Sequence, residues 1–138
     1  QALRIPGARL VKLPAVADDR GLLSFAEVGS HLPFVPRRYF VIMDVPAGKM
    51  RGAHGHRIAH QFLVCLRGRC TISLDDGRQR DEIILQSPQD GLHVPPGVWN
   101  DLVNFSFDPL LLCLACEPYD PHEYIRDRGE LGAGRDPR

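Results

Sequence analysis

Three of the six histidines in this chain lie close together, between Arg51 and Gln61. His54, His56 and His60 are separated by even numbers of residues. Because alternate residues of a β-strand point to the same face, these imidazoles can converge in one cavity. The spacing is compatible with a metal site, with general acid–base catalysis by imidazole, or with a solvated histidine-rich loop.

The four cysteines offer another possible site. Cys113 and Cys116 have the C-x-x-C spacing of many zinc sites. Residues 110–116 read as one buried strand, however, and positions i and i+3 of a strand point to opposite faces. We therefore predict that Cys65, Cys70, Cys113 and Cys116 are buried thiols, and unpaired thiols favour a reducing, cytoplasmic location.

The elements that position these side chains are predicted to be short strands, because apolar runs alternate with turn residues along the chain. The runs are 10–13, 22–26, 38–45, 60–66, 70–74, 81–85, 91–95, 102–105 and 110–115. Asp76-Gly77 between two of them predicts a hairpin. Strands at this spacing predict an all-β sandwich or barrel.

The C-terminal part is predicted to differ from the rest. Residues 121–128 are predicted to form one short helix, with Asp120 as its N-cap and Pro121 at its first position. We expect a single domain over residues 1–128 and a polar tail over residues 129–138.

The charge balance argues against large anionic partners. The 138 residues include 17 basic and 17 acidic side chains, so the formal net charge is zero. We therefore expect neither nucleic acid nor an anionic membrane surface as a partner. No apolar run approaches the ~20 residues of a membrane span. Gln1–Leu10 also lacks a signal-peptide layout, which agrees with a cytoplasmic protein.

The histidine-rich segment resembles the first motif of the cupin superfamily, and a later segment resembles the second. The two segments read Gly48-x5-His54-x-His56-x4-Gln61-x6-Gly68 and Pro95-Pro-Gly97-x2-Asn100-x3-Asn104. The resemblance implies a double-stranded β-helix, or jelly roll. Metal-binding cupins use two histidines, a glutamate and a third histidine, and the last two positions are Gln61 and Asn100 here. Neutral amides are poor ligands for a divalent metal, so we expect none, although His60 could replace one ligand.

A closer resemblance, over residues 10–128, is to the bacterial sugar 3,4-ketoisomerases, which share the domain of a xanthan-locus protein family. The segments that carry it are Arg51-Gly-x-His-x-His, His60-Gln-Phe-Leu-Val-Cys-Leu-x-Gly68, Leu74-Asp-Asp-Gly77, Gly91-Leu-His-Val-Pro-Pro-x-Val-Trp99 and Tyr119-Asp-x-x-x-Tyr-Ile-Arg-Asp127. The resemblance implies a metal-independent homodimer that acts on dTDP-4-keto-6-deoxyglucose. It also implies that His54 and His56 work at the sugar.

The implied reaction moves a carbonyl from C4 to C3 through an enediol(ate). Imidazole, with an ordinary pKa of ~6.5, suits both the removal and the return of a proton near neutral pH. We expect His54 to abstract the C3 proton and His56 to serve C4 or to shuttle between the oxygens. No cofactor is expected, because one carbon is oxidised as its neighbour is reduced.

Further residues are expected to bind the substrate, because arginine pairs well with phosphate, amides can donate or accept hydrogen bonds and an indole can wall a sugar pocket. The expected set is Arg20, Tyr39, Arg51, Gln61, Trp99 and Asn100. The family often has a tyrosine where this chain has Phe40, after Tyr39. Arg37-Arg38 is interpreted as a solvated strand end, and His93 as a structural histidine.

Three other functions remain open on the sequence. They are a metal-using cupin dioxygenase, a 3,5-epimerase-like sugar enzyme and a non-catalytic sugar-nucleotide-binding or regulatory cupin. For the isomerase itself, the nucleotide and the configuration of the product at C4 are also open.

Overall fold

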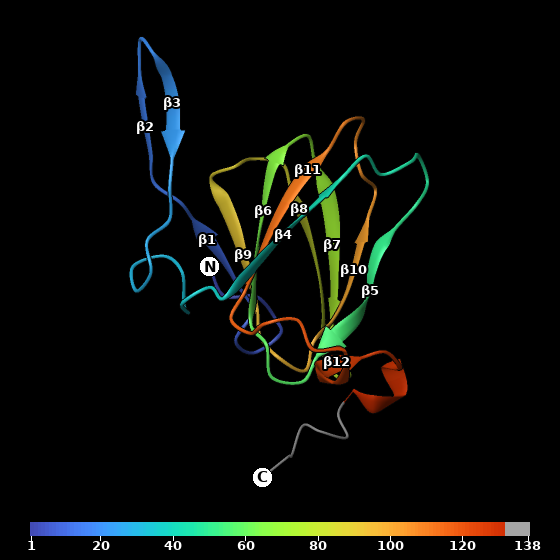
Figure 1. Ribbon diagram of the computed structural model, residues 1–138. Coiled ribbons are helices and arrows are strands. Elements are labelled where there is room, and N and C mark those ends of the chain that lie inside the picture. The colour runs from blue at the N-terminus through green and yellow to red at the C-terminus, as the bar shows by residue number, and fades with distance from the viewer. Residues whose placement is uncertain (132–138) are drawn as a thin grey trace.

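In the computed structural model, which describes residues 1–131, two five-stranded sheets face each other and one hairpin projects from them (Figure 1). The first sheet has the order β1 (Arg9–Lys12), β9 (Asp90–Val94), β6 (Gln61–Arg67), β11 (Leu110–Ala115) and β4 (Arg38–Met43). The second has the order β12 (Tyr124–Ile125), β5 (Arg51–His56), β10 (Trp99–Val103), β7 (Cys70–Asp75) and β8 (Arg80–Leu85). The hairpin pairs β2 (Ala15–Asp18) with β3 (Gly21–Ser24). The predicted all-β jelly roll is thus confirmed.

The main core lies between the two sheets and follows the alternation of the strands. In β11, Leu111, Cys113 and Ala115 are buried and point inward, whereas the residues between them are only partly covered. Cys65 and Cys70 belong to the same core. All four cysteines are free thiols, and three are buried as predicted, whereas Cys116 is only partly buried.

A smaller apolar cluster covers the outer face of the first sheet. Phe62 and Val64 of β6 point outward there and pack against Leu13 and Leu32 from the N-terminal region. Phe62 lies directly over Gly91, where a Cβ atom would stand only 2.2 Å from Phe62 Cζ. The two strands can therefore pack at this spacing only with glycine at position 91.

The C-terminal prediction needs correction, because residues 121–128 do not form a continuous helix. Asp120 does cap a turn, since its side chain accepts a hydrogen bond of 3.0 Å from the backbone N–H of His122. That turn, η1 (Pro121–Glu123), is a single 3₁₀ turn, and the chain then pairs with β5 as β12. Pairing with an open strand edge also buries Ile125, which a solvent-exposed helix would not do.

The end of the described chain forms one more 3₁₀ turn, η2 (Arg128–Glu130). Most of the predicted tail, residues 132–138, lies outside the described residues. Within residues 1–131 there is no helix with the length and apolar character that crossing a membrane requires.

Candidate active site

His54 and His56 lie on β5 and face the same side, as the sequence predicts. Their ring centroids are 5.2 Å apart and the ring planes are nearly perpendicular. A β-bulge precedes them, where the pairing of β5 with β10 shifts register. Gly52 and Ala53 both have positive φ at this bulge, and a Cβ at Gly52 would lie 2.8 Å from Asn100 Oδ1. The bulge brings β5 close to Asn100 and re-aims the strand just before the two histidines.

A buried carboxylate holds His56. Nδ1 of His56 lies 2.7 Å from Oε1 of Glu123, and both side chains are almost completely buried. The other oxygen, Oε2, accepts hydrogen bonds from the backbone N–H groups of Ile58 (3.0 Å) and Ala59 (2.9 Å). Burial by itself raises the pKa of Glu123, but these hydrogen bonds outweigh burial and hold the pKa below its usual value.

The tautomer of His56 follows from this arrangement. An ionised carboxylate can only accept, so Nδ1 of His56 carries a proton and donates it to Glu123. Nε2 is then the unprotonated nitrogen, and it is buried without a hydrogen-bond partner among the described residues. Burial lowers the pKa of His56, and the hydrogen bond to Glu123 opposes that effect. His56 is therefore arranged as a base whose Nε2 is free to take a proton.

His54 has the same tautomer for a different reason. Its Nδ1 lies 3.0 Å from the carbonyl oxygen of Gly52, which can only accept a hydrogen bond. Burial, with a smaller contribution from His56, lowers the pKa of His54 to about 4. His54 is thus a neutral imidazole near neutral pH, again with Nε2 available as a proton acceptor.

Strand β4 brings a different set of side chains to the site from the one expected. Arg38, Phe40 and Ile42 are covered on its inner face, whereas Tyr39 is 69% exposed on the outer face. Tyr39 therefore does not contribute its hydroxyl to the site. Arg38 is not a solvated strand end, because its Nη1 donates a hydrogen bond of 3.4 Å to the hydroxyl of Tyr124 and its other nitrogens are buried. The tyrosine hydroxyl at this site comes from Tyr124 on β12.

A cavity of about 60 Å³ opens between the sheets beside His54. Three of the predicted substrate-binding residues, Arg51, Gln61 and Asn100, line it. Gln61 and Asn100 are buried, and Nδ2 of Asn100 has no hydrogen-bond partner among the described residues. The remaining lining residues are mostly apolar: Phe40, Ile42, Gly52, Leu63, Leu102 and Cys113. The arrangement suits a small polar ligand whose hydrogen-bonding groups meet the two amides and the imidazole of His54 beside apolar side chains.

Two other predicted residues are not brought to this cavity. Arg20 lies in the turn between β2 and β3, the projecting hairpin of Figure 1. Its guanidinium is 2.6 Å from the carboxylate of Asp18. Trp99 and Asn100 point to opposite faces of β10, and Nε1 of Trp99 donates to Asp101 on the outer face at 3.2 Å. Local strand alternation thus separates the indole from the neighbouring amide.

His60 is also separate from the paired imidazoles of β5. Its Nδ1 lies 2.9 Å from Nε2 of His93, and Phe34 packs against both rings. The predicted structural role of His93 agrees with this contact. His60 therefore cannot replace a ligand beside His54 and His56.

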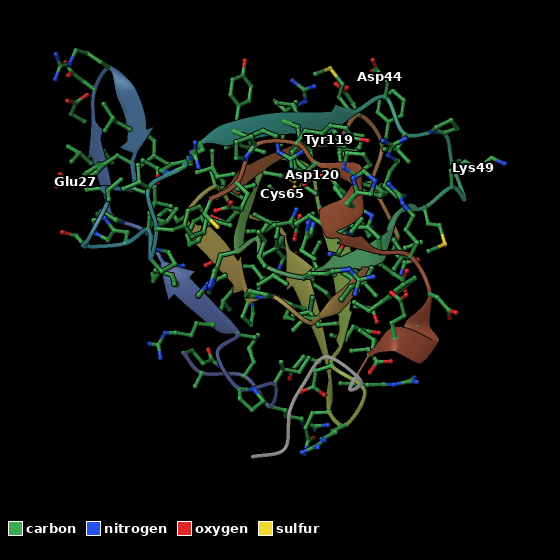
Figure 2. The ribbon with its side chains drawn as sticks, turned by 60° about the horizontal axis from the view of Figure 1, so that its bottom comes forward. Glu27, Asp44, Lys49, Cys65, Tyr119 and Asp120 are labelled. Carbon is green, nitrogen blue, oxygen red and sulfur yellow. The ribbon has the colours of Figure 1, made fainter. Side chains whose placement is uncertain are left out.

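Sequence reasoning missed Glu123, Tyr124 and Arg38 as site residues. The segment after β11 carries the first two across the end of the barrel at which β5 ends and β4 begins (Figure 1). Figure 2 shows Tyr119 and Asp120 on this crossing segment. Tyr124 contacts both imidazoles, with ring centroids 4.9 Å from His54 and 4.5 Å from His56. Tyr119 and Tyr124 both belong to the family-like motif of residues 119–127, which was the available signal.

The donors at the cavity do not fit a divalent metal. Nε2 of each imidazole is free of hydrogen bonds in the described part of the chain, but the other two positions of the cupin metal set are the neutral amides of Gln61 and Asn100. Residues 1–131 contain no group of three or more His, Cys, Asp or Glu side chains arranged to hold a metal ion. Two imidazoles and two neutral amides are a weak set for such ions. They are well suited to hydrogen bonding and proton transfer.

A family model, a curated relative and solved structures all relate this chain to sugar 3,4-ketoisomerases. Residues 6–133 match the family model described as FdtA: WxcM-like, C-terminal. The TDP-4-oxo-6-deoxy-alpha-D-glucose-3,4-oxoisomerase of Aneurinibacillus thermoaerophilus is 39% identical over 118 residues, covering 86% of this chain and 85% of that protein. A 3,4-ketoisomerase from Helicobacter canadensis superposes with a TM-score of 0.88 at 37% identity, covering 94% of this chain and 98% of that one. QdtA, a sugar 3,4-ketoisomerase from Thermoanaerobacterium thermosaccharolyticum in complex with TDP, superposes with a TM-score of 0.87 at 34% identity, covering 91% of each chain.

Proposed function

Because the chain belongs to the FdtA family (WxcM-like, C-terminal), we propose that it is a sugar-nucleotide 3,4-ketoisomerase that moves the keto group of TDP-4-keto-6-deoxyglucose from C4 to C3. One observation in this chain carries the proposal. Two imidazoles lie side by side, one of them (His54) at the cavity, each with Nδ1 held so that Nε2 can accept a proton. Two such groups can act as general acid and general base in proton transfer between adjacent carbons.

The reaction needs a base, an acid and no redox partner. When the C3–H bond breaks, the proton goes to an imidazole Nε2, the electron pair forms the C3=C4 bond and the carbonyl π pair moves onto O4. We assign this step to His54, which then gives the proton to O4. Nε2 of His56 takes the O3 proton as the C3=O bond forms, and His56 delivers that proton to C4. Each positioned acid–base group typically contributes about 10²–10⁴-fold.

Substrate contacts follow from the cavity lining. Gln61 and Asn100 can hydrogen-bond to sugar oxygens, because their amides are buried at the cavity. Arg51 lies at the same cavity and is exposed, which suits the diphosphate at its rim. At about 60 Å³ the cavity is far smaller than a site that encloses a whole ligand, which is typically about 300–1,000 Å³. The reacting edge of the sugar therefore enters it while the nucleotide stays outside.

We further propose that the enzyme works as a homodimer without a metal. The projecting hairpin supports the dimer, because Val16, Leu22 and Leu23 are each more than half exposed there. Apolar side chains on a protruding hairpin are typical of an interface. The amide-rich donor set supports chemistry without a metal. The four free thiols support a reducing compartment such as the cytoplasm.

The direct test is incubation of the protein with TDP-4-keto-6-deoxyglucose in D₂O, followed by NMR of the product. The expected result is a TDP-linked 3-keto-6-deoxy sugar with solvent deuterium at C4, because C3 carries no hydrogen once it is the carbonyl carbon. Binding without product would refute the isomerase and favour a non-catalytic binding module. Deuterium at C3 and C5 with the carbonyl still at C4 would indicate an epimerase instead.

A further inference from the structure

Arg38 carries a positive charge inside the barrel that no described residue neutralises. Its Nε and Nη2 atoms are buried and have no hydrogen-bond partner within residues 1–131. Nη1 makes a single long hydrogen bond, to the neutral hydroxyl of Tyr124. The rings of Phe40 and Tyr119 lie 5.5 Å and 5.6 Å from the guanidinium carbon. Aromatic faces favour a cation, but they do not satisfy its N–H donors.

Such an arrangement is costly for a folded protein. Arginine stays charged in proteins, so burial cannot be relieved by loss of its proton. A buried charge is normally paired, and each donor left without an acceptor costs free energy. Two adjacent free donors, Nε–H and Nη2–H, form a fork that matches an oxygen anion. The missing partner is therefore expected to be an anionic oxygen that a ligand supplies.

The position of Arg38 identifies which oxygen this is. Tyr124 receives its hydrogen bond and packs against both His54 and His56, so the guanidinium and the two imidazoles surround one tyrosine. Burial lowers the pKa of His56 and the charge of Arg38 makes a smaller contribution in the same direction, which agrees with this position. The diphosphate has an exposed alternative in Arg51 at the cavity rim.

We propose that Arg38 stabilises the enediolate, with its Nε–H and Nη2–H groups donating to the sugar oxygen that becomes negative when the C3 proton is removed. The inference rests on the proposed 3,4-ketoisomerase function and adds a catalytic residue to it. The charge on this oxygen develops only during the reaction. Arg38 therefore stabilises the transition state more than the bound substrate, which raises kcat with little effect on KM.

The test compares Arg38→Gln and Arg38→Lys with Arg37→Gln, which removes the neighbouring exposed charge. Loss of one preorganised donor to an oxyanion typically lowers kcat by about 10²–10³-fold. We expect a loss of that size in Arg38→Gln, with KM and the Kd for TDP within about threefold of wild type. Arg38→Lys keeps the charge but loses the fork, so its kcat should lie between those of Arg38→Gln and wild type. Arg37→Gln should behave as wild type.

Exchange of the C3 proton with D₂O should fall in parallel with kcat in Arg38→Gln, because the intermediate itself is destabilised. Unchanged kcat in the Arg38 variants would overturn the inference. So would weaker TDP binding with unchanged kcat, which would assign Arg38 to the diphosphate. If Arg38→Gln does not fold, the kcat of Arg38→Lys tests the inference instead. A wild-type kcat in Arg38→Lys would overturn the role assigned to the paired Nε–H and Nη2–H donors. The wild-type protein in the same assay separates the proposed function from the proposed role of Arg38. If the wild type forms no 3-keto product, the ketoisomerase function itself is refuted.

Discussion

The hydrogen bond between Glu123 and His56 makes Glu123→Gln an informative substitution. In the wild type, Oε1 accepts from Nδ1 of His56 and Oε2 accepts from the backbone N–H groups of Ile58 and Ala59. A glutamine has only one oxygen. If the amide oxygen of the glutamine faces Ile58 and Ala59, it accepts from both backbone N–H groups. The NH₂ group of the amide then points toward Nδ1 of His56. Nδ1 must then become the acceptor, and the proton of the imidazole moves to Nε2.

The expected loss follows from this change of tautomer. With a proton on Nε2, His56 can no longer take one from the sugar or return it. A positioned acid–base group contributes about 10²–10⁴-fold, so kcat should fall by that factor, or roughly 3–5 kcal/mol of transition-state stabilisation. If the amide keeps its NH₂ toward the backbone donors instead, two buried N–H groups lose their acceptor. That outcome would lower stability by about 1–3 kcal/mol for each group.

The assay is conversion of TDP-4-keto-6-deoxyglucose followed by NMR, together with thermal unfolding of each variant. Glu130→Gln is the matched control from the same C-terminal region, because this carboxylate is exposed and pairs, within residues 1–131, only with Arg57 at 2.8 Å. It should keep kcat within about twofold, as expected for an exposed ion pair. Wild-type kcat and wild-type Tm in Glu123→Gln would refute the role assigned to Glu123.

A pH profile adds a second, independent readout. Burial lowers the pKa of His56 and the Glu123 carboxylate opposes this, because it favours the imidazolium. Removing the carboxylate therefore lowers the pKa of His56 further, so this imidazole stays neutral to a lower pH. The acid limb of kcat/KM, expected below pH ~6.5 in the wild type, should move to lower pH in Glu123→Gln although the plateau falls. A shift to higher pH would contradict the direction of this coupling.

Three further substitutions test other parts of the structure. His54→Asn should lower turnover by about 10²–10⁴-fold and abolish deuterium uptake at C3, measured by NMR, and full turnover would contradict its role as base. Gly91→Ala places a Cβ 2.2 Å from Phe62 Cζ. It should therefore lower the free energy of unfolding by about 1–3 kcal/mol, measured in urea. An unchanged midpoint would show that the ring of Phe62 can move without cost. Leu23→Asp in the projecting hairpin should convert dimer to monomer in light scattering, whereas a wild-type mass that is already monomeric would refute the dimer.

Several parts of the site could be predicted because they depend on local rules. Apolar runs between turn residues identify strands, and a strand alternates its faces, so His54 and His56 were correctly placed together. The resemblance to the two cupin motifs, and not a local rule, placed Gln61 and Asn100 at the cavity. Strand alternation also explains the failure at Tyr39, because Arg38 and Phe40 occupy the inner face of β4 and the residue between them must point outward.

Other parts depend on contacts that are distant in the chain. Glu123 lies 67 residues from His56 in sequence, and nothing local marks it as the carboxylate that sets the tautomer of that imidazole. The segment around it even suggested a helix, since Asp120 and Pro121 are good helix-start residues. Pairing of β12 with the open edge of β5 overrode that preference and buried Glu123 against the histidine.

The sequence by itself determined the all-β class, the pair of imidazoles on one strand face and the amides where cupins hold metal. The first two follow from side-chain alternation and residue type, which act over a few residues, and the third follows from the resemblance to the cupin motifs. Only the tertiary structure decided which charges surround the imidazoles. It carries the C-terminal segment across the end of the barrel, so that Glu123 reaches His56 and Tyr124 meets Arg38. Protonation states and unpaired charges depend on what surrounds a group in space, and that is set by how distant strands pack.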